Sequence, residues 1–202
     1  MKVYLLLMCV AIALTLLVTP LVRFVCLKWG IVPQLRSRDL QATPIPRLGG
    51  VAMTIALIIT MLIASRIPYM APLFTTAIPW SVMAAAAGMC ALGVIDDIIE
   101  LDWMAKLAGQ ILITGGMALG GVQLVTFPIF GLTIGSSRLS LFATVFIVVG
   151  IINAVNFIDG LDGLAAGMIA IGAGAFFVYS YAITRLMGAA SYATAASLIV
   201  IA

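Results

Sequence analysis

Long apolar runs limit this chain to the folds that a membrane permits. Runs such as Val3–Val22, Gly49–Ser65 and Trp80–Ile95 contain few or no charged residues. A helix needs roughly 20 predominantly apolar residues to cross a bilayer. Of the 202 residues, 64% are hydrophobic and 8% are charged, whereas soluble domains have about 45–50% apolar and about 25% charged residues. The sequence predicts an all-α, polytopic transmembrane helical bundle.

The apolar runs predict six full spans and a truncated seventh. Residues Gln123–Gly135 alternate apolar and turn residues, which predicts a short external β-hairpin. The last apolar run begins at Tyr192 and ends at Ala202, too short to cross a hydrocarbon core about 30 Å thick. We therefore interpret residues 1–202 as the N-terminal fragment of a longer chain, forming a single integral-membrane domain. The six full spans are Val3–Val22, Gly49–Ser65, Trp80–Ile95, Ala105–Val122, Leu139–Asn153 and Leu164–Thr184.

The charged residues predict how the chain is oriented. If every predicted span is real, the first, third and fifth loops share one side of the membrane, and all seven acidic residues lie in them. Most basic residues lie there too, so the positive-inside rule makes this side cytoplasmic and puts the N-terminus outside. The basic residues form no continuous stripe, which argues against a nucleic-acid partner. The basic residues expected outside are Lys2, Arg66, Arg138 and Arg185.

The first group of candidate site residues follows the third apolar run. Asp96 and Asp97 come directly after it, with Glu100 and Asp102 just beyond. Acids at a helix end also occur as solvated termination signals, so this alternative stays open. The C-terminus of a helix disfavours anions by roughly 0.3–1 kcal/mol each, and a cation would relieve that repulsion. Magnesium fits because it takes carboxylate, phosphate and water oxygens, and Asp97 or Asp96 would hold it.

The second group comprises Asn153, Asn156, Asp159 and Asp162, each three residues after the one before. This spacing keeps neighbouring side chains on adjoining parts of one face if the helix continues that far. Gly160 and the later Gly163 fit either a turn or the close approach of a ligand. The alternative interpretation is that this segment is a glycine-rich turn whose polar side chains have no functional role. The pattern predicts a strip of amide and carboxylate groups at the membrane edge.

The third group is basic and precedes the second apolar run. Arg36, Arg38 and Arg47 lie in the first loop, and Gly49-Gly50 opens the next predicted helix. The arginines are equally explained as orientation signals that bind anionic lipid head groups. Arg47 beside a helix N-terminus would also favour phosphate, because free backbone N–H groups and a guanidinium both attract anions.

Three segments together resemble the polyprenyl-phosphate N-acetylhexosamine-1-phosphate transferase superfamily. They are PIPRLGG at Pro44–Gly50, GVIDD at Gly93–Asp97 and NFIDGLDGLAAG at Asn156–Gly167. The resemblance implies a magnesium enzyme, with manganese as a substitute, in the bacterial plasma membrane. Its cytoplasmic site would transfer a sugar-1-phosphate from a UDP-sugar to polyprenyl phosphate and release UMP, the first membrane step of cell-envelope polysaccharide synthesis. A homodimer is a further expectation. The implied catalytic residues are Asp96, Asp97, Asp159 and Asp162, and the implied substrate-binding residues are Arg47, Asn153, Asn156, Gly160 and Leu161.

Details of the motifs point to one branch of the superfamily. Phe157-Ile158 before Asp159 is more similar to enzymes that use UDP-N-acetylglucosamine than to the phospho-N-acetylmuramoyl-pentapeptide transferase, which is the alternative. Gln41 stands where these enzymes often have histidine, and the chain contains no histidine. An ion or metal transporter is the alternative from another class. Transporter acids usually lie near the membrane midplane, whereas these are predicted at its cytoplasmic boundary.

Overall fold

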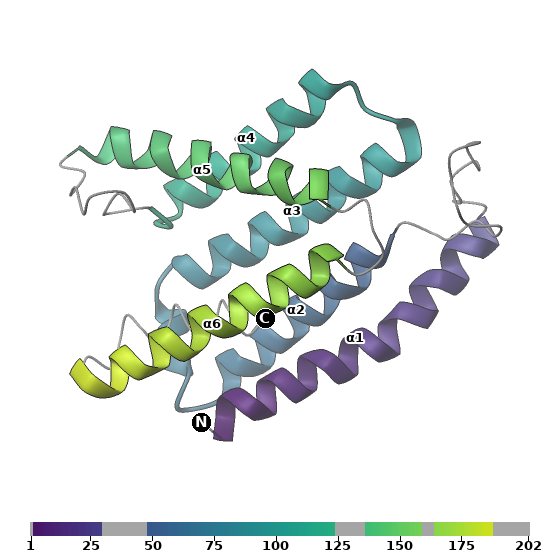
Figure 1. The fold of residues 1–202 in the computed structure, drawn as a ribbon. Helices are drawn as coiled ribbons and strands as arrows, with labels where there is room; N and C mark the ends of the chain where they lie inside the picture. Colours follow the sequence, from purple (N-terminus) through teal and green to yellow (C-terminus); the bar gives the residue numbers. More distant parts are fainter. Residues whose placement is uncertain (1, 30–47, 124–135, 159–163, 188–202) are drawn as a thin grey trace.

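The computed structural model describes residues 2–29, 48–123, 136–158 and 164–187. Within these ranges every regular element is helical, which confirms the predicted all-α class. The predicted hairpin, except Gln123, and the truncated seventh helix lie outside the described residues. The elements in Figure 1 are α1 (Lys2–Trp29), α2 (Gly49–Arg66), the 3-10 helix η1 (Ala71–Thr75), α3 (Ile78–Ile99), α4 (Trp103–Leu119), α5 (Ser137–Ile158) and α6 (Leu164–Met187).

Five of the described helices, α1, α2, α3, α5 and α6, are long and apolar enough to cross a membrane. The protein is therefore a polytopic helical membrane protein. The remaining helix, α4, has 17 residues and so spans about 25 Å at 1.5 Å per residue. Because this is less than a hydrocarbon core of about 30 Å, six full spans stay a prediction.

Several helices continue past their predicted ends. α1 runs to Trp29 rather than Val22, so Arg23 and Lys28, expected in the first loop, belong to it. α3 and α5 carry predicted site residues with them. α3 runs to Ile99 rather than Ile95, so Asp96 and Asp97 belong to its last turn. It stops at Glu100, which has a left-handed φ of 48° and donates its N–H to the Asp96 carbonyl over 2.9 Å. α5 runs to Ile158 and includes Asn156. The ends had been predicted from where each apolar run stops. The helical hydrogen bonding of the backbone continues for several residues beyond that point.

The helices pack mainly against their neighbours in sequence, as α1 on α2, α2 on α3, α3 on α4, α4 on α5 and α5 on α6. Figure 1 shows α3, α4 and α5 together above α1, α2 and α6. A cluster of apolar side chains joins the start of α1 to the end of α2, to η1 and to α6. In this cluster Tyr4 contacts Phe177 and Tyr181 of α6, with ring centroids 5.7 Å and 6.2 Å apart.

The opposite end of the bundle carries the predicted site. Because neighbouring helices alternate in direction, the end of α3, the start of α4 and the end of α5 lie together, away from the cluster around Tyr4. The apolar cluster therefore fixes one end of the bundle and leaves the polar residues at the other.

Candidate functional site

A tight turn between α3 and α4 places polar groups from both helices side by side. Asp102 caps the start of α4, since its Oδ2 accepts a hydrogen bond from the Met104 N–H over 3.3 Å. Aspartate is a favoured N-cap because its side chain satisfies an N–H that has no partner within the helix. With the end of α3 closed at Glu100, α4 turns back along α3.

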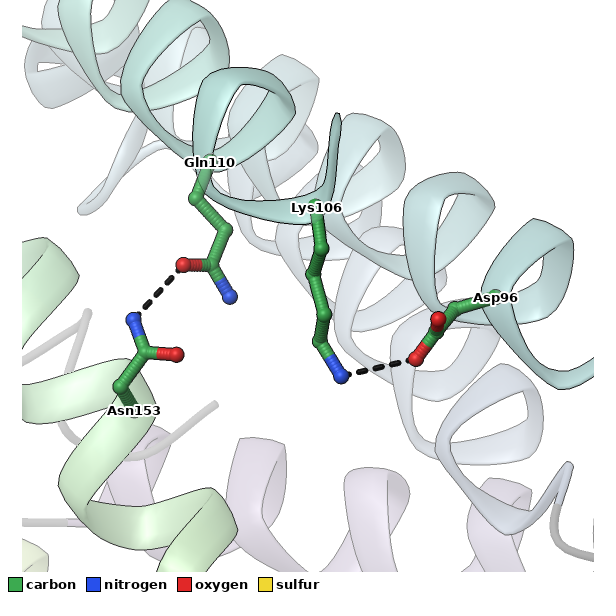
Figure 2. A network of polar contacts seen from close by, with 4 residues as sticks. All are labelled: Asp96, Lys106, Gln110 and Asn153. Carbon is green, nitrogen blue, oxygen red and sulfur yellow. Dashed lines mark hydrogen bonds and ion pairs between the residues drawn. The ribbon is translucent and has the colours of Figure 1, made fainter. Parts of the chain in front are cut away.

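This turn forms an ion pair between the two helices. Nζ of Lys106, in the first turns of α4, lies 2.7 Å from Oδ2 of Asp96 in the last turn of α3 (Figure 2). The Lys106 side chain is 30% exposed and the Asp96 side chain 22%. Both groups are half-buried, so each keeps part of its surface open to a further charged group.

One helical turn further along, α4 contacts α5. The Gln110 side chain is 3% exposed, and its Oε1 accepts a hydrogen bond from Asn153 Nδ2 over 2.7 Å (Figure 2). Asn153 Nδ2 also donates to the Val149 carbonyl one turn earlier in α5, over 2.8 Å. A buried polar side chain is costly unless it is hydrogen-bonded, so this contact fixes the register of α5 on α4.

α4 thus links the two predicted groups of site residues. Lys106 and Gln110 are four residues apart and share one face of α4; the first contacts Asp96 and the second contacts Asn153. The sequence did not predict either contact, since the basic residues were interpreted there only as orientation signals or as anion-binding groups of the first loop. A polar residue such as Gln110 inside an apolar helix was the available signal, because such residues usually face a partner or a site.

The other predicted site residues are placed as follows. Asp97 is exposed in the last turn of α3, and adjacent helical residues point about 100° apart, so it faces another direction than Asp96. Asn156 is exposed, three residues after Asn153 on α5. The other predicted residues, Arg47, Asp159, Gly160, Leu161 and Asp162, lie outside the described residues.

The described acids provide only part of a metal site. Among the described residues, no three His, Cys, Asp or Glu side chains lie close enough to hold a metal ion by themselves. Magnesium often uses one or two carboxylates and takes its other ligands from substrate phosphates and water. Either carboxylate, that of Asp97 or that of Asp96, fits this donor set as one ligand, and the same oxygen chemistry fits manganese.

Comparison with known proteins identifies the family. The model of glycosyl transferase family 4 matches residues 79–202. The chain is 38% identical over 181 residues to the decaprenyl-phosphate N-acetylglucosaminephosphotransferase of Mycolicibacterium smegmatis, covering 87% of this chain and 44% of that protein. It is 30% identical over 197 residues to a probable undecaprenyl-phosphate N-acetylglucosaminyl 1-phosphate transferase of Bacillus subtilis, covering 96% and 51%.

A different transferase is also similar to this chain. The phospho-N-acetylmuramoyl-pentapeptide-transferase of Desulforudis audaxviator is 33% identical over 165 residues, covering 69% of this chain and 48% of that protein. The chain spans about half the length of the curated relatives it matches. The family match covers more than half of the chain and includes α3, α4, α5 and α6. The chain therefore belongs to glycosyl transferase family 4.

Proposed function

We propose that this protein takes part in the transfer of N-acetylglucosamine-1-phosphate, or a similar sugar-1-phosphate, from a UDP-sugar to polyprenyl phosphate. The observation that carries the proposal is the arrangement around α4, where Lys106 contacts Asp96 and Gln110 contacts Asn153 at one end of the bundle. The names of the mycobacterial and Bacillus relatives describe N-acetylglucosamine phosphotransferases that act on polyprenyl phosphates.

The reaction needs charge stabilisation more than a strong base. A phosphate monoester has a second pKa of about 6, so the lipid phosphate is largely dianionic near neutral pH. One of its oxygens attacks the β-phosphorus of the UDP-sugar, the bond from that phosphorus to the bridging oxygen breaks, and UMP leaves with the electron pair. Positioning and electrostatic stabilisation therefore supply most of the catalysis, as in phosphoryl transfer generally.

The described residues divide this work between them. The Lys106 ammonium would stabilise phosphate charge, and Asp96 holds Lys106 at the start of α4. Asp97 would hold Mg²⁺, because the Asp96 carboxylate faces another direction and pairs with Lys106. When bound, the ion supplies positive charge against the diphosphate and the departing UMP. In the proposed enzyme Asp159 and Asp162 act with Asn156 to position the nucleotide or the lipid phosphate.

We place this site at the cytoplasmic face of the bacterial plasma membrane, with the N-terminus outside. The acidic residues of α3 and the start of α4 share one end of the bundle, and the basic residues predicted on that side outnumber those on the other. The positive-inside rule then assigns this end to the cytoplasm.

UMP release from UDP-N-acetylglucosamine, measured with the full-length protein and polyprenyl phosphate, tests the proposal. We expect release that requires both substrates and Mg²⁺. Release only from the UDP-N-acetylmuramoyl-pentapeptide would favour the alternative transferase. Three phospho-N-acetylmuramoyl-pentapeptide-transferases share 29–33% identity with the chain over 68–69% of its length. No release from any UDP-sugar would contradict the proposal.

Transport of an ion or a metal explains the described residues less well. Asp96 and Asp97 lie in the last turn of α3, whereas the acids of transporters usually lie near the membrane midplane in broken helices. Ion flux through the purified protein in liposomes, without UMP release, would reverse this preference.

A further inference from the structure

The orientation of the Asn153 side-chain amide is fixed by two acceptors. The nitrogen of an asparagine amide carries two hydrogens, and Asn153 Nδ2 donates to Gln110 Oε1 over 2.7 Å and to the Val149 carbonyl over 2.8 Å. The two bonds use both hydrogens. Asn153 is an exposed residue, and within the described part of the chain its carbonyl oxygen, Oδ1, is the group left for a ligand.

The reversed orientation of this amide is disfavoured. A flip of Asn153 would turn Oδ1 towards the Val149 carbonyl, which has no hydrogen to donate. Gln110 could flip with it and donate in its place, but the Val149 bond would still be lost and two oxygens would face each other. Because Gln110 is 3% exposed, water is a poor substitute partner there. Val149 and Gln110 together therefore keep Oδ1 outward.

The Asn153 carbonyl oxygen lies on the side of the residue that faces Lys106. Figure 2 shows this oxygen and the amide nitrogen of Gln110 both directed towards Lys106. An acceptor from α5, donors from α4 and the half-buried Asp96 of α3 thus lie near one another.

We infer that Asn153 binds a hydrogen-bond donor of the substrate, a hydroxyl or an amide N–H, and that Gln110 is the positioning residue that holds it in that orientation. This inference rests on the proposed function. Of the two substrates in the proposed reaction, the dianionic lipid phosphate offers no donor, whereas a UDP-N-acetylhexosamine carries sugar and ribose hydroxyls, an acetamido N–H and a uracil N–H. Asn153 therefore recognises the UDP-sugar and not the lipid phosphate.

Steady-state kinetics of the full-length protein tests this, with UDP-N-acetylglucosamine and polyprenyl phosphate varied separately. Gln110→Met keeps much of the side-chain shape and removes the acceptor, so Asn153 loses its fixed orientation. We expect the KM for the UDP-sugar to rise about tenfold, the usual scale for one lost hydrogen bond, while the KM for polyprenyl phosphate stays close to that of the wild type. Asn153→Ala should likewise raise the KM for the UDP-sugar and leave the KM for polyprenyl phosphate unchanged.

A double-mutant cycle separates positioning from a structural role. If Gln110 acts through Asn153, the Gln110→Met/Asn153→Ala protein is no worse than Asn153→Ala alone. Thr114→Val is the matched control, because Thr114 is 1% exposed one turn further along α4; its substrate constants should stay those of the wild type. Effects of Gln110→Met and Asn153→Ala that multiply, or a rise in KM for the lipid phosphate, would overturn the inference.

A further variant keeps the test decisive if Gln110→Met does not fold. Gln110→Glu keeps an acceptor oxygen in the place of Gln110 Oε1, so Asn153 Nδ2 can still donate to residue 110 and Oδ1 stays outward. We expect the KM for the UDP-sugar of Gln110→Glu to stay well below that of Asn153→Ala. Equal KM values in these two variants would overturn the inference. A wild-type protein that releases no UMP would overturn the proposed function and this inference with it.

Discussion

Nζ of Lys106 and Oδ2 of Asp96 are 2.7 Å apart across the turn that joins α3 to α4. Both side chains are partly exposed, and ion pairs in such places contribute about 0–1 kcal/mol to stability. The pair is therefore too weak to explain Lys106 as a structural residue. Its position beside the acids at the polar end of the bundle instead places one positive charge where the proposed reaction handles phosphate.

Lys106→Met should lower kcat/KM for UMP release while leaving the protein folded. The substitution keeps the aliphatic stem and removes the charge. Loss of one preorganised group that stabilises developing charge typically costs about a hundredfold or more in rate, whereas loss of the ion pair costs little stability. Lys106→Arg keeps the charge and should retain more activity. Wild-type kinetics in the methionine variant would contradict the assigned role.

Asp97→Asn should abolish transfer while leaving the protein inserted and folded. The amide nearly preserves the shape of the side chain but removes a negative charge from the carboxylate proposed to hold Mg²⁺. The lost charge weakens metal affinity, so raising Mg²⁺ should recover part of the UMP release if Asp97 is a ligand. Little recovery is expected if Asp97 acts as a base or a nucleophile.

Glu100→Gln is the control for this substitution, because Glu100 closes the end of α3 and lies outside the Gly93–Asp97 motif. We expect a modest effect on transfer from it. Ordinary transfer by the Asp97→Asn protein at ordinary Mg²⁺ would remove Asp97 from the catalytic group.

The helices were predictable because bilayer-spanning segments have a composition that depends on no partner. The ends of the helices were less predictable. Hydropathy places the end of α3 at Ile95, where the continuous apolar run stops, whereas hydrogen bonding continues the helix to Ile99. Asp96 and Asp97 were therefore expected after the helix and instead form part of it.

The candidate site was predictable as a set of residue types, and the contacts within it were not. Asp96 and Asn153 were proposed from sequence, and their roles stay predictions. Their partners, Lys106 and Gln110, follow from the packing of α4 between α3 and α5. A contact between residues 43 positions apart, as Gln110 and Asn153 are, is set by helix packing that no local pattern encodes.

The orientation in the membrane is testable by labelling single cysteines in intact cells. In a protein without Cys9, Cys26 and Cys90, Arg66→Cys and Arg138→Cys should react with a membrane-impermeant maleimide. Arg66 ends α2 and Arg138 begins α5, which places both at the end expected outside. Trp103→Cys, at the exposed start of α4, should react only after the membrane is permeabilised. If position 103 is labelled in intact cells and position 138 is not, the protein has the opposite orientation in the membrane from the one proposed.

Gly120→Ala should destabilise the protein, because α3 approaches α4 too closely there to admit a side chain. A Cβ on Gly120 would lie 2.4 Å from the Cβ of Ser81, an atom whose position the backbone of α3 fixes. The helices must separate locally, and overpacking of this kind typically costs about 1–3 kcal/mol. The cost should appear as a lower unfolding midpoint in detergent.

Gly116→Ala is the matched control one turn earlier on α4, since a Cβ there would meet nothing within 4 Å. Alanine in place of a helical glycine favours the helix by up to about 1 kcal/mol, so this variant should be as stable as the wild type or more so. Opposite shifts of the two unfolding midpoints would therefore report the close approach of α3 to α4 at Ser81. A Gly120→Ala protein as stable as the Gly116→Ala protein would show that the two helices are further apart than the structure has them, and the contact between Lys106 and Asp96 at the other end of the pair would come into question with it.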